Sequence, residues 1–252
     1  MRADTPAIAV TDLAKTYRDV VAVDGISFSV ARGAIVGLLG GNGAGKTTTV
    51  AMIMGLVLPT RGTATVLGAD MARERYRVLS RINFESPYVE MPKRLTVRQN
   101  LKVFGTLYSV DALGERIEAL AASLHLKDFL DRPSGQLSAG QKTRVALAKA
   151  LINSPDVLLL DEPTASLDPD TADWVRSRLE AYRREHHAAI LLASHNMPEV
   201  ERLCDDVLMM KEGKIVDRGA PADLIARYGR QTMEDVFLDV ARGRRGSREA
   251  AE

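Results

Sequence analysis

Short continuous runs of apolar residues recur along the chain and predict buried strands. The runs at 35–39, 157–160 and 189–193 consist of apolar residues and a single glycine. Runs of this length, too short for a typical helix, are characteristic of strands buried on both faces of a sheet. Additional strands are expected at 8–10, 26–30, 63–67, 207–210 and 214–216.

The spacing changes between residues 95 and 153, where apolar side chains recur every three or four positions. One such series comprises Val97, Leu101, Phe104 and Tyr108, and its period indicates amphipathic helices. Strands are predicted on both sides of this helical segment. The pattern therefore predicts an α/β core with a small antiparallel patch and an inserted helical lobe.

The segment after the run at 35–39 carries a phosphate-binding motif. Residues 40–47 read Gly-Gly-Asn-Gly-Ala-Gly-Lys-Thr and match G-x-x-x-x-G-K-[ST], between a predicted strand and a helix expected to reach about Leu56. Backbone N–H groups would hold the phosphates, the catalytic candidate Lys46 would add a charge at the β- and γ-phosphates, and Thr47 would ligate Mg²⁺. The nucleotide-binding residues predicted here are Gly40, Asn42, Gly43, Ala44, Gly45, Lys46, Thr47 and Thr48.

The run at 157–160 ends in two adjacent carboxylates, Asp161 and Glu162. Ligands of open α/β sheets bind at the C-terminal ends of the strands, which is where this pair is expected. Asp161 is predicted to hold Mg²⁺ through water, because Mg²⁺ favours a carboxylate together with retained waters. Glu162 is predicted to polarise the water that attacks the γ-phosphate.

Residues 137–141 add a third motif, Leu-Ser-Ala-Gly-Gln. This segment matches the LSGGQ signature of ATP-binding cassette (ABC) proteins except for Ala139. With the two motifs above, the chain resembles the nucleotide-binding subunit of an ABC transporter over about residues 7–225. The resemblance implies a phosphate-loop NTPase (RecA-like) core with an antiparallel β subdomain. It also implies that Ser138, Gly140 and Gln141 reach the γ-phosphate bound by an opposite subunit.

Further positions match the family's pattern. Tyr17 resembles the aromatic residue that stacks on adenine, and Asp168, in the segment 166–168, resembles the D-loop that communicates between two sites of a dimer. His195 follows the run at 189–193 and resembles the switch histidine that contacts the γ-phosphate and orients Glu162.

One position departs from the family's pattern. The resemblance places Glu85 where the family's Q-loop carries a glutamine that contacts Mg²⁺ or the water. A glutamate still offers a hard oxygen to Mg²⁺, but it adds a negative charge near the γ-phosphate. We therefore expect Glu85 to permit catalysis and to alter its Mg²⁺ dependence or its coupling.

Composition limits the partners and the cellular compartment expected for this chain. The net charge of +1 does not call for a nucleic-acid partner, and the single cysteine, Cys204, excludes an internal disulfide and suits a reducing compartment. No apolar run approaches the ~18 residues of a membrane span, and no long apolar segment typical of a signal peptide stands at the N-terminus. A cytosolic protein that associates peripherally with the cytoplasmic face of the inner or plasma membrane is the expectation.

The resemblance also implies partners and a division of the chain. Residues 1–225 would form one ABC ATPase domain, with a helical subdomain at about 95–153, and residues 226–252 a short tail. Two copies would sandwich two ATP molecules and drive a separate membrane permease. The segment 232–238 resembles the ending of ATPases from ABC-2 type exporters, which favours export over import; the cargo stays open.

Two other classes of protein carry related motifs. A non-transport ABC ATPase, such as one that serves iron–sulfur assembly or another soluble complex, remains an alternative because those proteins are also single cassettes of similar length. A phosphate-loop kinase or GTPase is disfavoured by the segment 137–141 and by the pair of carboxylates at 161–162.

Overall fold

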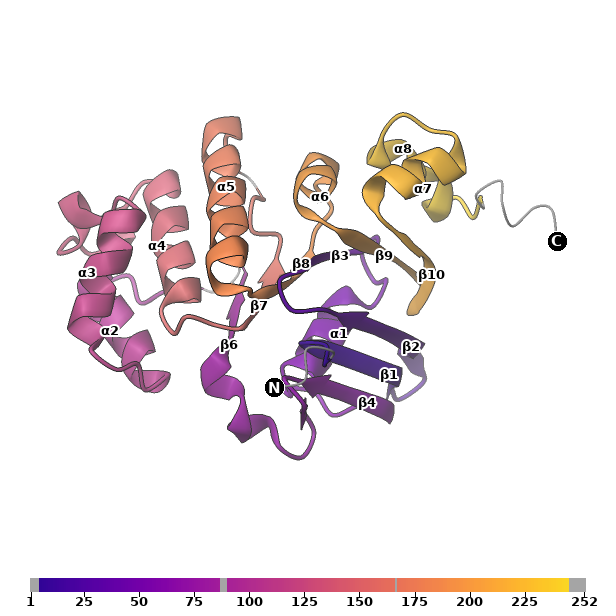
Figure 1. The fold of residues 1–252 in the computed structure, drawn as a ribbon, viewed down its shortest axis with the longest axis horizontal. Coiled ribbons are helices and arrows are strands. Elements are labelled where there is room, and N and C mark those ends of the chain that lie inside the picture. Colours follow the sequence, from indigo (N-terminus) through magenta and orange to yellow (C-terminus); the bar gives the residue numbers. More distant parts are fainter. Residues whose placement is uncertain (1–4, 87–89, 166, 245–252) are drawn as a thin grey trace.

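The computed structural model describes residues 5–86, 90–165 and 167–244, and its centre is a six-stranded sheet (Figure 1). The strands lie in the order β10-β9-β3-β8-β7-β6, and all neighbours are parallel except β10, which pairs antiparallel with β9. Their bounds are Ile35–Leu39 (β3), Ile82–Glu85 (β6), Val157–Asp161 (β7), Ala189–Ala193 (β8), Asp206–Lys211 (β9) and Lys214–Gly219 (β10).

A second, antiparallel sheet contains β1 (Ile8–Tyr17), β2 (Val20–Val30), β4 (Arg61–Val66) and β5 (Ala69–Asp70), in the order β2-β1-β4-β5. Its first two strands are longer than the expected segments 8–10 and 26–30. Register shifts interrupt the pairing of β1 with β2, and Asp12 and Gly25 both have positive φ. A bulge inserts an unpaired residue and so breaks the period of two, which is why the sequence pattern marks only the regular parts of this hairpin.

Eight α-helices complete the described part of the chain. They are α1 (Lys46–Ile53), α2 (Val97–Leu107), α3 (Leu113–Ser123), α4 (Ala139–Leu151), α5 (Pro169–His186), α6 (Met197–Leu203), α7 (Pro221–Tyr228) and α8 (Met233–Ala241). Short 3-10 turns occur at Arg75–Arg77, Leu79–Arg81, Lys127–Phe129 and Ser134–Gln136. Helices α2, α3 and α4 form the inserted helical lobe, so the predicted α/β class with an antiparallel patch and a helical insertion is confirmed.

The sequence pattern missed several helices and overextended one. Helices α5 to α8 lie outside the segments where apolar spacing predicts a helix, and α1 ends at Ile53 rather than near Leu56. Gly55 has a φ of 69° just after the end of α1, a conformation that glycine adopts without strain and that stops a helix.

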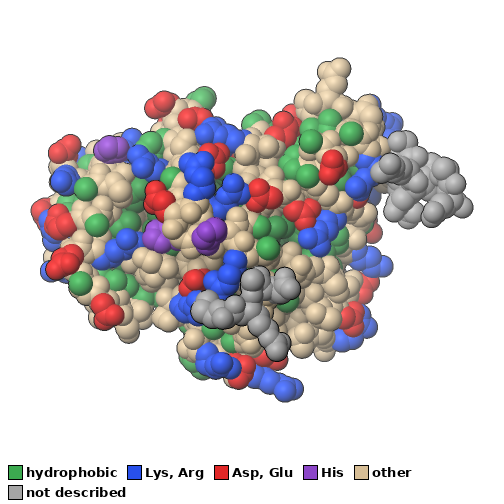
Figure 2. Space-filling model, in the orientation of Figure 1, with side chains coloured by type: hydrophobic (Ala, Val, Ile, Leu, Met, Phe, Trp, Pro, Cys, Tyr) green, Lys and Arg blue, Asp and Glu red, His purple; other side chains and the backbone are tan. Residues whose placement is uncertain are grey.

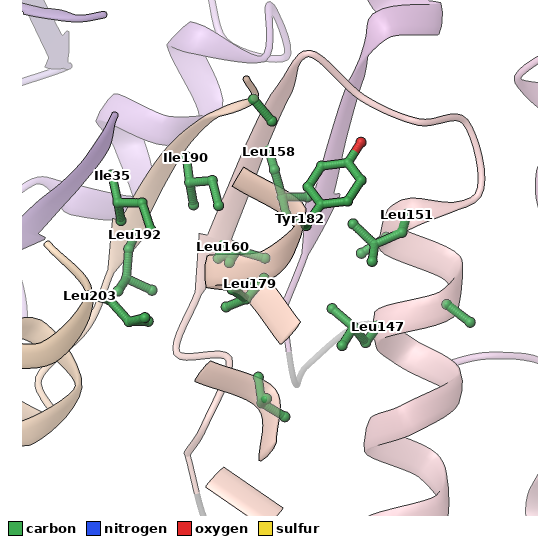
Figure 3. Packing of buried hydrophobic residues seen from close by; sticks show 14 of the residues in the cluster. Ile35, Leu147, Leu151, Leu158, Leu160, Leu179, Tyr182, Ile190, Leu192 and Leu203 are labelled. Carbon is green, nitrogen blue, oxygen red and sulfur yellow. The ribbon is translucent and has the colours of Figure 1, made fainter. Parts of the chain in front are cut away.

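The central sheet is buried on both faces. On one face, Leu158, Leu160 and Ile190 point toward Leu179 and Tyr182 of α5, as Figure 3 shows. The intervening strand residues pack on the other face, against α1 and the antiparallel sheet. Burial of each aliphatic side chain stabilises the fold by roughly 1.5–3 kcal/mol. This gain explains why these strands consist of continuous apolar residues.

This topology brings three loops to one edge. Because β3, β7 and β8 are parallel neighbours or next neighbours, their C-terminal ends meet at the same side of the sheet. The phosphate loop follows β3, Asp161 ends β7, and His195 lies just after β8. Residues separated by more than a hundred positions in the chain are therefore placed together.

The C-terminal helix is part of the packed body rather than a free extension. Met233, Val236 and Val240 of α8 are buried in the same core as the central sheet. In the part of the chain that the structure describes, no helix is long and apolar enough to cross a membrane. Acidic and basic side chains are interspersed over the face drawn in Figure 2.

Candidate active site

The phosphate loop needs glycine at two positions for reasons visible in its surroundings. Gly45 has a φ of 102°, and a Cβ there would lie 2.5 Å from the carbonyl oxygen of Ala22. A Cβ on Gly40 would lie 2.6 Å from the carbonyl oxygen of Met210. Gly45 also caps α1, with no side chain bonded to the first turn, so the backbone N–H groups at this helix end are available to an anion.

Lys46 lies across this loop. Its Nζ donates to the carbonyl oxygens of Gly40 at 2.6 Å and Gly41 at 3.2 Å. Burial lowers the pKa of Lys46, while the nearby charges of Glu162 and Asp161 oppose that shift. The ammonium is thus held at the loop by weak carbonyl partners, which a phosphate can replace with stronger, charge-assisted hydrogen bonds.

Glu162 occupies an unusual backbone conformation at the tip of β7. Its φ is 53°, a left-handed value that is uncommon outside glycine. Its N–H donates to the carbonyl of Ala193 at 2.8 Å, which joins the ends of β7 and β8. Strained residues of this kind cluster at functional sites when the surrounding structure holds them, and the conformation turns the Glu162 carboxylate toward the loop after β8.

His195 meets that carboxylate. Its Nδ1 lies 2.5 Å from Oε1 of Glu162, and its backbone N–H donates to Oε2 at 3.3 Å. The Glu162 side chain is 13% exposed, whereas that of His195 is 70% exposed. The two predicted catalytic side chains are therefore in direct contact, with the imidazole open to solvent on its other side.

Asp161 completes this cluster beside Lys46. Burial raises the pKa of Asp161, the charge of Glu162 raises it further, and Lys46 opposes both. Among the described residues, no group of three or more His, Cys, Asp or Glu side chains forms a metal cage. A carboxylate with the hydroxyl of the exposed Thr47 suits Mg²⁺, which binds one or two protein groups, retained waters and substrate phosphates.

Glu85 is placed differently from the predicted metal contact. It is the last residue of β6, and its Oε2 lies 2.6 Å from Nζ of Lys149 on α4. The contact has ion-pair distance but not hydrogen-bond geometry. The side chains are only 11% and 5% exposed. Burial raises the pKa of Glu85, and Lys149 opposes that shift.

The signature segment begins α4. Ser138 accepts a hydrogen bond from the N–H of Gln141 at 3.3 Å, and the Gln141 side chain accepts one from the N–H of Ser138 at 3.0 Å. This reciprocal capping box satisfies two donors of the first turn. Ala139 is the first helical residue, so its extra methyl group, relative to glycine, causes no backbone strain. A Cβ on Gly140 would be accommodated 3.5 Å from Thr171.

The signature is separated from the phosphate loop of its own chain. In Figure 1, α4 lies on the opposite side of α5 from α1. Lys46, Asp161, Glu162 and His195 are brought together, whereas Ser138, Gly140 and Gln141 are not part of that cluster.

Tyr17 and Asp168 also occupy specific positions. Tyr17 is 45% exposed at the end of the β1–β2 hairpin, with Nζ of Lys15 lying 4.9 Å from its ring centroid. Asp168 caps α5 by accepting from the N–H of Thr171 at 3.0 Å, a bond that lowers the pKa of Asp168. Ser166 of the D-loop segment, and Pro87 and Tyr88 after the Q-loop position, lie outside the described residues.

Sequence reasoning did not single out several buried polar residues near the site. Lys149 pairs with Glu85, and Glu199 accepts hydrogen bonds from Thr164 and Ser194. The sequence offers one signal for the Lys149 contact, a lysine within the otherwise apolar segment 145–151. For the Glu199 contacts it offers only a weak signal, a glutamate four residues after His195.

Known proteins resemble this chain in sequence and in fold. A family model described as ABC transporter matches residues 23–165. Nod factor export ATP-binding protein I of Ralstonia nicotianae is 38% identical over 223 residues, which cover 88% of this chain and 69% of that protein. The ABC transporter ATP-binding protein NatA of Bacillus subtilis is 36% identical over 238 residues, covering 92% and 96%.

A solved structure of an ATP-binding subunit of an ABC transporter superposes with a TM-score of 0.85 at 25% identity, covering 94% of this chain and all of that one. The predicted phosphate-loop NTPase core is confirmed by this likeness. The chain therefore belongs to the ABC transporter family, as one of its ATP-binding ATPase proteins.

Proposed function

We propose that this chain is the ATP-hydrolysing subunit of an exporter and powers a separate membrane permease. The observation that carries the proposal is the convergence of Lys46, Asp161 and the Glu162–His195 pair at one sheet edge. In this assignment the phosphate loop binds ATP, with adenine on the exposed ring of Tyr17. Glu162 accepts the proton of the attacking water, and His195 orients Glu162.

Magnesium would be held by Thr47 and Asp161, where it would shield the negative charge of the β- and γ-phosphates. Lys46 would leave the carbonyl oxygens of Gly40 and Gly41 for the phosphates. A direct role for Glu85 at the metal requires that its carboxylate leave Lys149, which makes Glu85 the least supported of the three proposed metal contacts.

The active unit would contain two ATPase subunits. The signature at the start of α4 lies apart from its own phosphate loop, so it can complete a γ-phosphate site only on a second subunit. Ser138 and the free N–H groups of this helix end would supply that contact, with Asp168 at the subunit boundary. We propose residues 1–225 as the ATPase domain, 95–153 as its helical subdomain, and 226–252 as a tail whose α8 packs on the body.

An exposed apolar hollow supports the permease partner. A cavity of about 320 Å³ lies between the end of α1 and the end of α2, next to β6. At its rim, Leu56 is 72% and Leu107 is 74% exposed. Exposed apolar side chains beside a hollow suit a surface that a partner covers. In this assignment the chain lies on the cytoplasmic face of the membrane, and the permease covers this hollow and the loop at 85–94.

Export is supported by the names of the relatives and by the C-terminal segment. A protein named for Nod factor export shares 38% identity with this chain, and residues 232–238 resemble the ending of ABC-2 type exporter ATPases. The cargo would be chosen by the permease.

The test is purification of the tagged chain with Glu162→Gln from detergent-solubilised native membranes, followed by mass spectrometry and an ATPase assay of the wild type. We expect Mg²⁺-dependent hydrolysis and a stoichiometric multi-span membrane protein. Recovery from the soluble fraction with only soluble partners would contradict the transporter role and favour the assembly-ATPase alternative.

A further inference from the structure

A fully buried carboxylate lies directly behind the proposed catalytic pair. Glu199, in the first turn of α6, is 0% exposed. Its Oε1 accepts a hydrogen bond from the hydroxyl of Thr164 at 2.8 Å, and its Oε2 accepts one from the hydroxyl of Ser194 at 2.7 Å. Burying an ionisable group is costly unless its hydrogen bonds are satisfied, and here both oxygens have a donor.

The two hydroxyls belong to the two loops that carry the proposed chemistry. Thr164 lies two residues after Glu162, and Ser194 lies immediately before His195. The loops leave different strands, β7 and β8, and approach each other at the sheet edge. One side chain on a third element, α6, therefore holds both loops at once.

Asn196 closes the network from the other side. Its N–H donates to the Ser194 hydroxyl at 3.0 Å, and its side-chain amide donates to the Thr164 hydroxyl at 3.3 Å. Each hydroxyl thus donates to Glu199 and accepts from Asn196. Fully satisfied buried networks of this kind rigidify the segments that they join.

The network also bears on the position of His195. Because 70% of its side chain is exposed, packing does little to fix the imidazole, and its place depends on the contact with Glu162 and on the backbone at 194–196. Glu162 has a left-handed backbone conformation, and Thr164, two residues later, links its loop to the same network.

We infer that Glu199 is a positioning residue for ATP hydrolysis, which ties the Glu162 loop to the His195 loop through Thr164 and Ser194. The inference rests on the proposed function of Glu162 and His195. Displacement of reacting groups by about 1 Å can cost on the order of 100-fold in rate. Loss of the Glu199 contacts should therefore reduce turnover without removing any group that touches ATP.

The experiment compares Glu199→Ala and Glu199→Gln with Thr164→Val and Ser194→Ala in the full chain, measuring kcat, KM and Kd for ATP with Mg²⁺, and the thermal unfolding midpoint. Tyr182→Phe is the control variant, because it removes a buried hydroxyl that donates to the carbonyl of Pro155 at 2.9 Å. That bond lies before β7 begins, at the opposite end of the strand from Glu162.

For Glu199→Ala we expect kcat to fall by roughly 10- to 100-fold, with KM and Kd within about threefold of wild type. Glu199→Gln keeps the shape and one acceptor oxygen, so it should recover part of the loss. Thr164→Val and Ser194→Ala should each reproduce part of it. Tyr182→Phe should keep the wild-type kcat even when its unfolding midpoint shifts as much as those of the Glu199 variants.

Wild-type kcat in Glu199→Ala would overturn the inference, as would equal losses of kcat in Tyr182→Phe and the Glu199 variants at equal stability. Should Glu199→Ala fail to fold, Glu199→Gln, Thr164→Val and Ser194→Ala test the inference instead. Wild-type kcat in all three, or losses equal to that of Tyr182→Phe at equal stability, would overturn it. An inactive wild type would overturn the proposed function and this inference together, whereas active wild type beside fully active variants would overturn the inference alone.

Discussion

The ion pair between Glu85 and Lys149 links the central sheet to the helical lobe and is open to a direct test. Glu85 ends β6, and Lys149 lies on α4, the helix that begins with the signature at Ser138. Replacing Lys149 with methionine keeps an unbranched side chain but leaves the Glu85 carboxylate buried without its cation. The variant therefore measures what the pair contributes to holding α4 against the sheet.

The expected loss can be estimated from the contact distance and the burial. At 2.6 Å and an effective dielectric constant of about 20, the attraction between unit charges is about 6 kcal/mol. Desolvation offsets much of this in the intact pair, but removing one partner of a buried pair typically costs about 3–5 kcal/mol. For a chain of this size such a loss lowers the unfolding midpoint by roughly 6–20 °C.

The assay is urea-induced unfolding of wild type, Lys149→Met, Glu85→Gln and the double variant. The exposed pair of Lys93 and Glu90, whose side chains are 62% and 69% exposed, supplies the control. Lys93→Met should change the free energy of unfolding by less than about 1 kcal/mol. In the double variant most of the Lys149→Met loss should return, because neither buried side chain then carries an unpaired charge.

The pH dependence follows from the raised pKa of Glu85. An acid whose pKa is higher in the folded chain keeps its proton there longer, so stability is present at low pH and falls as pH rises from the unfolded pKa through the folded one. Lys149→Met removes the opposing charge and should steepen this fall, while Glu85→Gln should flatten it. A Lys149→Met variant as stable as Lys93→Met across this range would refute the reasoning.

Three further predictions concern the site. Glu162→Gln should bind ATP, hydrolyse it very slowly and accumulate as a dimer in size-exclusion chromatography with ATP; near wild-type turnover would remove Glu162 from the base role. Lys46→Ala should lose nucleotide affinity by at least about tenfold in a fluorescent-nucleotide titration, because a charge-assisted contact contributes roughly 1.5–3 kcal/mol; unchanged affinity would contradict the contact. Glu85→Gln should shift the Mg²⁺ concentration for half-maximal ATPase activity, and an identical Mg²⁺ profile would exclude Glu85 from the metal site.

Local sequence was sufficient for the features that depend on neighbouring residues. The runs at 35–39, 157–160 and 189–193 are buried on both faces of the sheet, as continuous apolar runs require. Gly40 and Gly45 lie where a Cβ would collide with backbone atoms. Glycine at these two positions of the phosphate-loop motif is therefore required by sterics. The apolar run that ends in Asp161 and Glu162 predicts their position at the ligand-binding edge of the sheet.

Tertiary structure alone decided the partners of the buried charges. Glu85 and Lys149 are 64 positions apart, and Thr164 and Glu199 are 35 apart, so periodicity along the chain carries no information about either contact. The same applies to the bulged β1–β2 hairpin, where a register shift conceals the alternation. A side chain's local pattern reports whether it will be buried, but which charge it meets there depends on how separate elements pack.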